Sequence, residues 1–319
     1  MAAISNGEGQ AEDAIESWLK KFSALARHQR DVRAAWVVGS RARTVQPADE
    51  WSDIDIMLIT TRPTRYLHTS TWLRDIGSPW MDYLIETQIG ARNVRHAVFE
   101  GAVCVDFAIV SSVETRWASP ILRLVARYPQ LIRLLPSGLA TQVAAWFQIL
   151  RKGAPLVLVD KDGAAARMMH VPVDKPLQRP VTEREFSNVV GGFWSLSMWT
   201  AKQQLRGQLW MANYECAYEL RTHLLRMIEW HARAVHGSEY DTWYWGRFLE
   251  RWADPRAVAA LDDVFSRYDA SSSREALFAS TELFSWLARE TAERLHFWYA
   301  GEAEEAVTGW LRARLSADA

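Results

Sequence analysis

Two neighbouring segments decide the fold of this chain: Val32-Arg33-Ala34-Ala35-Trp36-Val37-Val38-Gly39-Ser40-Arg41 and Ser52-Asp53-Ile54-Asp55-Ile56-Met57-Leu58-Ile59-Thr60. Each contains a short, apolar run, which is typical of a buried strand. The first run stops at Gly39-Ser40, a pair that favours a tight turn. The second carries two aspartates where a buried strand would otherwise be wholly apolar.

These aspartates lie at a spacing that brings carboxylates together. Side chains alternate along a strand, so Asp53 and Asp55 point to the same side while Ile54 points into the core. Asp106 repeats the anomaly within the apolar run 103–109, where an unpaired carboxylate would be costly. Carboxylate oxygens suit Mg²⁺, and Asp53, Asp55 and Asp106 are the predicted metal-binding and catalytic residues. The alternatives are a capping role for Asp53 and buried ion pairs for the other two.

The turn before these aspartates has the composition of a phosphate-binding loop. Gly39 permits close approach of the backbone, and the amides after it, with the Ser40 hydroxyl, are suited to hold a triphosphate. Arg41 follows at once and is predicted to pair with the β- or γ-phosphate. Gly39, Ser40 and Arg41 are therefore the predicted nucleotide-binding residues of the first half.

The rest of the chain indicates an α+β protein with two domains. A helix is expected over 11–28, and further strands over 81–86, 94–100 and 103–110, the last two forming a hairpin through Gly101. After residue 115 helical periods dominate, with a capping box at Thr182 and Glu185 that opens a helix. We therefore expect a mixed-sheet domain with helices over 1–150, followed by a mainly α-helical bundle domain over 151–319.

Composition narrows the range of partners. The formal net charge is −1 and the pI about 6.7, which lacks the basic excess of a non-specific nucleic-acid binder. No apolar run is long enough for a membrane span, and no export signal is visible. Cys104 and Cys216 lie in apolar or aromatic stretches that favour reduced thiols. We expect a cytoplasmic protein that binds neither nucleic acid nor membrane.

The motifs together resemble a known family. A Gly-Ser turn, an Asp-x-Asp pair and a later third carboxylate are the signature of the polymerase-beta-type nucleotidyltransferase superfamily. More closely, the chain resembles the aminoglycoside 6-adenylyltransferase (streptomycin adenylyltransferase) family. The residues that carry this resemblance are Val38-Gly39-Ser40-Arg41, Ser52-Asp53-Ile54-Asp55-Ile56, Val105-Asp106-Phe107, Leu158-Val159-Asp160-Lys161-Asp162-Gly163, Arg179-Pro180-Val181-Thr182, Glu185-Phe186, Phe193-Trp194, Lys202, Arg206, Leu224-Leu225-Arg226-Met227 and Trp230-His231.

The resemblance implies transfer of AMP from ATP to a hydroxyl of an aminoglycoside, with release of pyrophosphate and antibiotic resistance as the result. A streptomycin-like acceptor modified at its 6-position is the leading candidate. Gln208 and Tyr214 stand where the family pattern has acidic residues, so another aminoglycoside stays open. The alternatives are transfer to a protein or other non-antibiotic hydroxyl, or a non-catalytic protein that binds a nucleotide or antibiotic. Asp106 is either a metal ligand or the general base.

Further candidates are three pairs of charged residues. Lys202 and Arg206 are four residues apart on one helix face and are expected to contact the triphosphate, with an exposed basic face as the alternative. Glu215 and Glu219, near Trp210, Tyr214 and Tyr218, and the even-spaced strand pair Asp82 and Glu86 are candidate contacts for a cationic acceptor. For Glu215 and Glu219, a solvated surface pair is the alternative.

Overall fold

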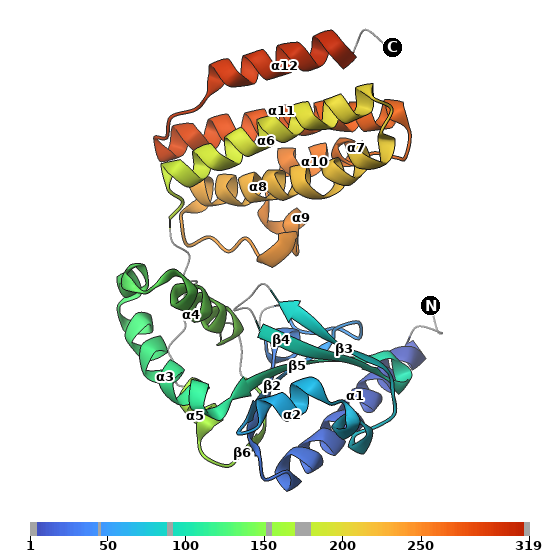
Figure 1. Ribbon diagram of the computed structural model, residues 1–319, viewed down its shortest axis with the longest axis vertical. Coiled ribbons are helices and arrows are strands. Elements are labelled where there is room, and N and C mark those ends of the chain that lie inside the picture. Colours follow the sequence, from blue (N-terminus) through green and yellow to red (C-terminus); the bar gives the residue numbers. More distant parts are fainter. Residues whose placement is uncertain (1–4, 44–45, 88–91, 151–154, 170–179, 316–319) are drawn as a thin grey trace. The chain divides into compact units, whose positions relative to one another are not determined.

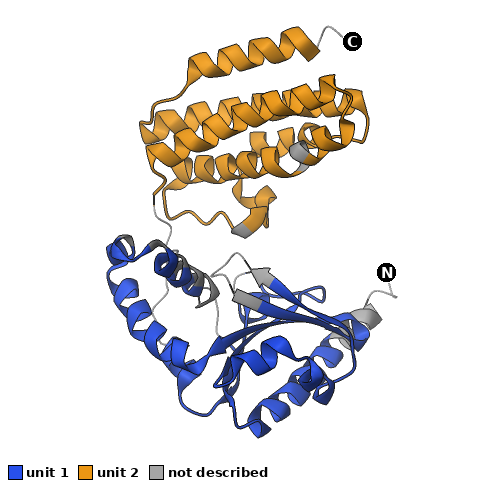
Figure 2. Ribbon diagram, in the orientation of Figure 1, with its two compact units in different colours: residues 1–177 blue, residues 178–319 orange. Residues whose placement is uncertain are grey.

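The computed structural model describes residues 5–43, 46–87, 92–150, 155–169 and 180–315. The chain divides into two compact units, Met1–Leu177 and Gln178–Ala319 (Figure 2). This division lies later than the expected boundary at residues 150/151, because the strand β6 (Val157–Asp160) pairs with β1 (Val32–Val38) and belongs to the first unit. The prediction of an α+β chain with a mixed sheet followed by helices is confirmed.

The first unit is built on one six-stranded sheet in the order β3-β4-β5-β2-β1-β6 (Figure 1). Neighbouring strands are antiparallel except for β2 and β5, which are parallel. The predicted strands all form, with ends shifted by a few residues at most. Besides β1 and β6, the strands are β2 (Ile54–Thr60), β3 (Pro79–Thr87), β4 (Arg92–Phe99) and β5 (Val103–Ser111).

The two faces of the sheet bury different cores. Side chains alternate along β2, so Ile54, Ile56 and Leu58 pack in one cluster with residues of α1 (Ser5–His28) and α2 (Pro63–His68). Met57 and Ile59 face the opposite cluster. That second cluster contains residues of α3 (Ser112–Arg127), α4 (Ser137–Leu150) and α5 (Ala164–Met169). Asp55 shares the face of Met57 and Ile59, so β2 carries its carboxylate on the α3–α5 side of the sheet.

The second unit is helical. Thr182 caps α6 (Glu183–Leu205) with the predicted capping box, and the rings of Phe193 and Phe284 stack with centroids 3.7 Å apart between α6 and α11 (Ala270–Leu295). α6, α8 (Arg221–His236) and α11 run alongside one another (Figure 1). The remaining elements are α7 (Leu209–Glu215), a π-helical segment (Cys216–Leu220), α9 (Leu249–Trp252), α10 (Pro255–Val264) and α12 (Gly301–Leu315).

In the described part of the chain, none of the helices is both long and apolar enough to cross a bilayer.

Candidate active site

Five residues, one on each of five neighbouring strands, form a row across one face of the sheet. Its members are each other's direct partners in the ladders: Tyr83 with His96, His96 with Asp106, Asp106 with Asp55, and Asp55 with Val38. Directly opposed residues on neighbouring strands point to the same side. The row therefore places two of the three predicted carboxylates next to each other, on strands that are far apart in sequence.

The turn after β1 closes on Asp55. Gly39 has φ +68°, and a Cβ at this position would lie 1.8 Å from Oδ2 of Asp55. Such a contact is impossible, and a positive φ is itself unfavourable for a residue with a side chain. Only glycine therefore allows the backbone of the 3₁₀ turn Gly39–Ala42, which includes Ser40, to approach the carboxylate this closely.

Asp53 lies just before β2 and is exposed. Its carboxylate contacts the thiol of Cys104, whose neighbour Val105 pairs with Ile54 in the parallel ladder. Burial first, and then the negative charge of Asp53 and the hydrogen bond to it, raise the pKa of the Cys104 thiol, with a further contribution from the charge of Asp106. Cys104 is a free thiol, as predicted. Asp55 and Asp106 are thus paired directly, whereas Asp53 lies just before β2, beside Cys104.

The row contains two residues that the sequence interpretation did not single out. His96 Nδ1 lies 2.6 Å from Oδ1 of Asp106, and the ring of Tyr83 lies 5.1 Å from the imidazole on the other side. The contact between His96 and Asp106 could have been predicted from the hairpin around Gly101, because residues at equal distances from a hairpin turn face each other. His96 and Asp106 are such a pair.

The carboxylate oxygens of this site are suited to a cation that also binds the phosphates of a substrate. Within the described residues, no group of three or more His, Cys, Asp or Glu side chains is arranged to hold a metal by itself. Mg²⁺ is usually held by one or two carboxylates and completes its shell with water and substrate phosphates. Asp55 and Asp106 supply the two carboxylates, and the absence of a side chain at Gly39 lets the backbone of the turn approach the Asp55 carboxylate closely.

Arg41 has a partner within the protein. Its Nη2 donates to the carbonyl oxygen of Ser52 at 2.9 Å and to that of Asp49 at 3.4 Å. The Ser52 hydroxyl in turn donates to Oδ1 of Asp49 at 2.7 Å. Arg41 thereby links the turn after β1 to the residues that lead into β2, and so holds the two sides of the candidate phosphate loop together.

Asp82 is separated from the carboxylate pair. It pairs with Ala97, one position along from the Tyr83–His96 pair, and therefore points to the opposite face of the sheet. There it forms an ion pair with Arg95, whose Nε also donates to the carbonyl oxygen of Tyr66. Asp82 thus has an ion-pair partner within the protein, and its contact with a cationic acceptor stays a prediction. The side chain of Glu86 lies outside the described residues.

The remaining predicted residues belong to the second unit. Lys202 lies in α6 with Nζ 6.0 Å from the centre of the Trp310 ring, and Arg206 is the exposed C-cap residue of the same helix. Glu219 lies in the π-helical segment and is partly exposed, whereas the side chain of Glu215 lies outside the described residues. Beside Glu219, the rings of Tyr214 and Tyr218 are stacked 6.3 Å apart.

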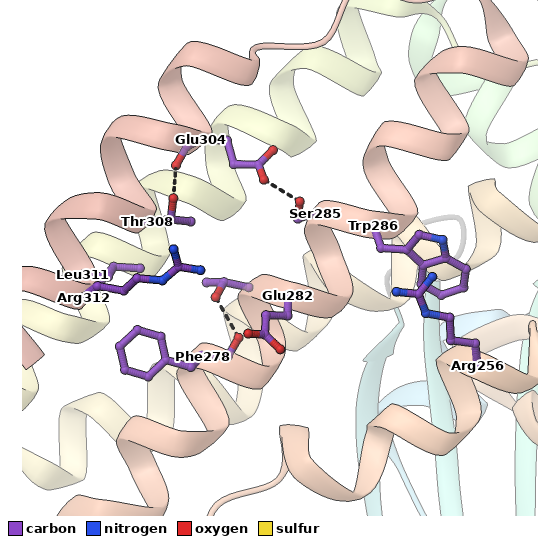
Figure 3. A pocket seen from close by; sticks show the side chains of 10 residues that line it. Arg256, Phe278, Glu282, Ser285, Trp286, Glu304, Thr308, Leu311 and Arg312 are labelled. Atoms are coloured by element: carbon purple, nitrogen blue, oxygen red, sulfur yellow. Dashed lines mark hydrogen bonds between the residues drawn. The ribbon is translucent and has the colours of Figure 1, made fainter. Parts of the chain in front are cut away.

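The second unit also contains a cavity of about 480 Å³ between α10, α11 and α12 (Figure 3). Its one buried carboxylate, Glu304, already accepts hydrogen bonds from Ser285, Arg289 and Tyr299. These contacts join α12 to α11 and give the carboxylate a structural role. The cavity is lined by Arg256, Phe278, Thr281, Glu282, Ser285, Trp286, Glu304, Thr308, Leu311 and Arg312.

Comparison with known proteins identifies the class to which this fold and site belong. A family model described as streptomycin adenylyltransferase matches residues 14–119 and 139–314. The chain belongs to the streptomycin adenylyltransferase family, which is a family of nucleotidyltransferase enzymes.

Individual proteins are also similar to this chain. The chain is 23% identical to an aminoglycoside 6-adenylyltransferase of Bacillus subtilis (strain 168) over 90% of this chain and 93% of the relative. It is 21% identical to one of Campylobacter jejuni, with 86% and 87% covered. Among solved structures, an aminoglycoside 6-adenyltransferase from Bacillus subtilis aligns over 92% of this chain and 95% of that chain, with a TM-score of 0.41 and 18% identity.

Proposed function

We propose that this chain is a Mg²⁺-dependent adenylyltransferase that transfers AMP from ATP to a hydroxyl of an aminoglycoside and so confers resistance to the antibiotic. The observation that carries the proposal is the adjacent pair Asp55 and Asp106, which lies against a turn that only Gly39 can make. Family membership supports adenylyl transfer as the reaction. The names of the relatives support an aminoglycoside as the acceptor, with a streptomycin-like molecule modified at its 6-position as the first candidate.

The proposed reaction forms one bond and breaks one. The acceptor hydroxyl oxygen attacks the α-phosphorus of ATP, and the bond from that phosphorus to the bridging oxygen of pyrophosphate breaks. The hydroxyl proton passes to water, or to Asp106 where that residue is the general base. Mg²⁺, when bound, would neutralise phosphate charge and hold the reacting groups in line. Asp55 and Asp106 would hold it, with Asp53 at the rim, and the alternative role of Asp106 is to accept the hydroxyl proton.

Other residues of the first unit would bind and orient the nucleotide. The backbone amides and hydroxyl around Ser40 are suited to contact the triphosphate. Arg41 would contribute positive charge toward the triphosphate. Its hydrogen bond to the carbonyl oxygen of Ser52 would at the same time hold the loop in place. From the second unit, Lys202 and Arg206 are the proposed further phosphate contacts. Glu215 and Glu219 are the proposed contacts for a cationic acceptor, together with the stacked pair Tyr214 and Tyr218.

The acceptor class is tested with ATP labelled at the α-phosphate. Purified protein is incubated with labelled ATP, Mg²⁺ and either a panel of aminoglycosides including streptomycin or a whole-cell protein extract. The proposal predicts label in a small antibiotic product. Label in a macromolecule would instead support the protein-acceptor alternative, and label in neither, with ATP bound but unchanged, would support a binding protein. Asp55→Asn should lose the transfer, and Asp75→Asn, the control at an exposed carboxylate, should keep it. Equal transfer by both variants would indicate a contaminating activity.

A further inference from the structure

His96 occupies a place in the site that the proposed chemistry does not yet use. Its Nδ1 lies 2.6 Å from Oδ1 of Asp106, and the side chains are 14% and 30% exposed. An ionised carboxylate only accepts hydrogen bonds, so with Asp106 ionised the imidazole donates from Nδ1. A hydrogen bond to a charged acceptor at this distance is among the stronger ones in proteins. His96 therefore restrains Asp106 directly.

The imidazole itself is held from two sides. β4 is an inner strand, paired with β3 and β5, so the backbone of His96 is fixed by ladders on both edges. The ring of Tyr83 lies 5.1 Å from the imidazole at an interplanar angle of 48°. In the row, Tyr83 contacts the side of His96 that faces away from Asp106. The His96 imidazole is thus held by the rigid sheet. A side chain that orients another one has to be held in this way.

We propose that His96 is a positioning residue: it fixes the Asp106 carboxylate through Oδ1 and so leaves Oδ2 to join Asp55 in holding the divalent cation. This inference rests on the proposed function, because it assigns a role within the same site. Asp106 and Asp55 carry like charges on directly opposed positions, and repulsion would favour rotation of one carboxylate away from the other. The hydrogen bond from His96 opposes that rotation. Ligating carboxylates are commonly held by such hydrogen bonds, and loss of one typically lowers metal affinity or activity 10- to 100-fold.

Three variants of His96 test the role. His96→Ala removes the donor. His96→Asn places an amide nitrogen close to the position of Nδ1, whereas His96→Gln places it farther out along the side chain. Val98→Ala is the matched control, because Val98 lies on the same strand and the same face, opposite Cys104. The thermal unfolding midpoint of each variant shows whether it folds, and His96→Asn keeps the test informative if His96→Ala does not.

The first readout does not depend on turnover. Mn²⁺ binding is measured by electron paramagnetic resonance in the presence of α,β-methylene-ATP. We expect the Mn²⁺ affinity of His96→Ala and His96→Gln to fall about 10-fold or more, and His96→Asn to recover a large part of it, while Val98→Ala stays within about twofold of wild type. Equal Mn²⁺ affinity in wild type and all three His96 variants would overturn the proposal. A fall that His96→Asn does not relieve would also overturn it, because the donor would then not be the cause.

The second readout is AMP transfer with saturating ATP and acceptor. At the Mg²⁺ concentration that saturates wild type, we expect kcat to fall about 10- to 100-fold in His96→Ala. A higher Mg²⁺ concentration should restore part of this loss, and the KM for the acceptor should stay unchanged. If wild-type protein transfers no AMP to any acceptor, the proposed function fails, and the Mn²⁺ measurement still decides the role of His96. If wild type is active and His96→Ala matches it in kcat and Mg²⁺ dependence, the inference on His96 fails alone.

Discussion

Asp55 and Asp106 are direct partners in the only parallel strand pair among the described strands of the sheet, although about fifty residues separate them in sequence. Each lies in a strand whose alternate side chains are fully buried, so neither carboxylate can turn inwards. Both are partly exposed on the same face. Like charges on directly opposed positions repel each other, and a cation bound to both would relieve that repulsion, which favours a role of the pair in binding.

Replacement of either member of this pair is expected to abolish activity without unfolding the protein. Asp55→Asn and Asp106→Asn each remove a charge that would face the phosphates, and we expect kcat to fall by about 100-fold or more. The thermal unfolding midpoint shows whether each variant is folded: relief of the like-charge repulsion is stabilising in both, and a weaker hydrogen bond to His96 is destabilising in Asp106→Asn. Asp75→Asn, an exposed carboxylate of the same unit outside the row, is the control and should keep wild-type activity. A variant of the pair that keeps wild-type kcat would contradict this role.

Gly39→Ala is expected to damage both stability and activity, because its Cβ would meet Asp55. Gly101→Ala is a close control: Gly101 also has a positive φ, of +78°, but open space around the added Cβ. Both variants carry a backbone cost of about 1 kcal/mol, and Gly39→Ala adds the clash. Chemical unfolding and kcat are measured side by side. Equal losses of stability in the two variants, with full activity in Gly39→Ala, would show that the close approach to Asp55 has no consequence.

Stability of the helical unit is expected to depend on pH through Glu229. Burial raises the pKa of this carboxyl to about 7, against the opposing charges of Arg233 and Arg226. A raised folded-state pKa means that the folded protein binds the proton more tightly, so this contribution to stability is lost as pH rises from about 4.5 to 7. The loss is on the order of 3 kcal/mol. Urea unfolding across this range should show a flatter pH dependence in Glu229→Gln than in wild type.

The control for that measurement is Glu250→Gln, an exposed carboxyl in α9. It should keep the wild-type slope of unfolding free energy against pH. A Glu229→Gln variant with the wild-type slope would show that Glu229 does not titrate in this range.

Glu304 is expected to stabilise the attachment of α12 to α11. Its buried carboxylate accepts from Arg289 Nε at 3.0 Å and from the Tyr299 hydroxyl at 2.6 Å, and from Ser285. Glu304→Ala leaves these donors without their acceptor and should lower the free energy of unfolding by about 2 to 3 kcal/mol. Glu305→Ala, on the exposed side of the same helix, should change it by about 0.5 kcal/mol or less. Similar values for the two variants would mean that the contacts add nothing to stability.

Much of the site could be predicted because its signals are local. Two apolar runs, a Gly-Ser turn and carboxylates inside buried strands are visible in the sequence, and the hairpin around Gly101 even implies the contact between His96 and Asp106. The face on which Asp82 lies could not be predicted in the same way. Strand alternation places Asp82 and Glu86 on one side, but which side depends on the pairing of Asp82 with Ala97, a register that the spacing along one strand does not fix.

The C-terminal boundary of the first unit also depends on strand pairing that local sequence does not determine. Nothing local in the sequence indicates that β6 returns to pair with β1. Such pairing is a long-range contact, decided by the open edge of β1 and by burial of Leu158 and Val159 against the core. The unit boundary therefore falls later than the change to helical periodicity.

The most direct test of the central claim is the mass of streptomycin after incubation with ATP, Mg²⁺ and purified protein. The account predicts that wild type adds one adenylyl group to the antibiotic and releases one pyrophosphate, and that Asp55→Asn and Asp106→Asn, both folded, do not. Product formed by Asp55→Asn at the wild-type rate, or adenylyl transfer by wild type that is undiminished after removal of divalent cations, would contradict the claim that this carboxylate pair carries the reaction.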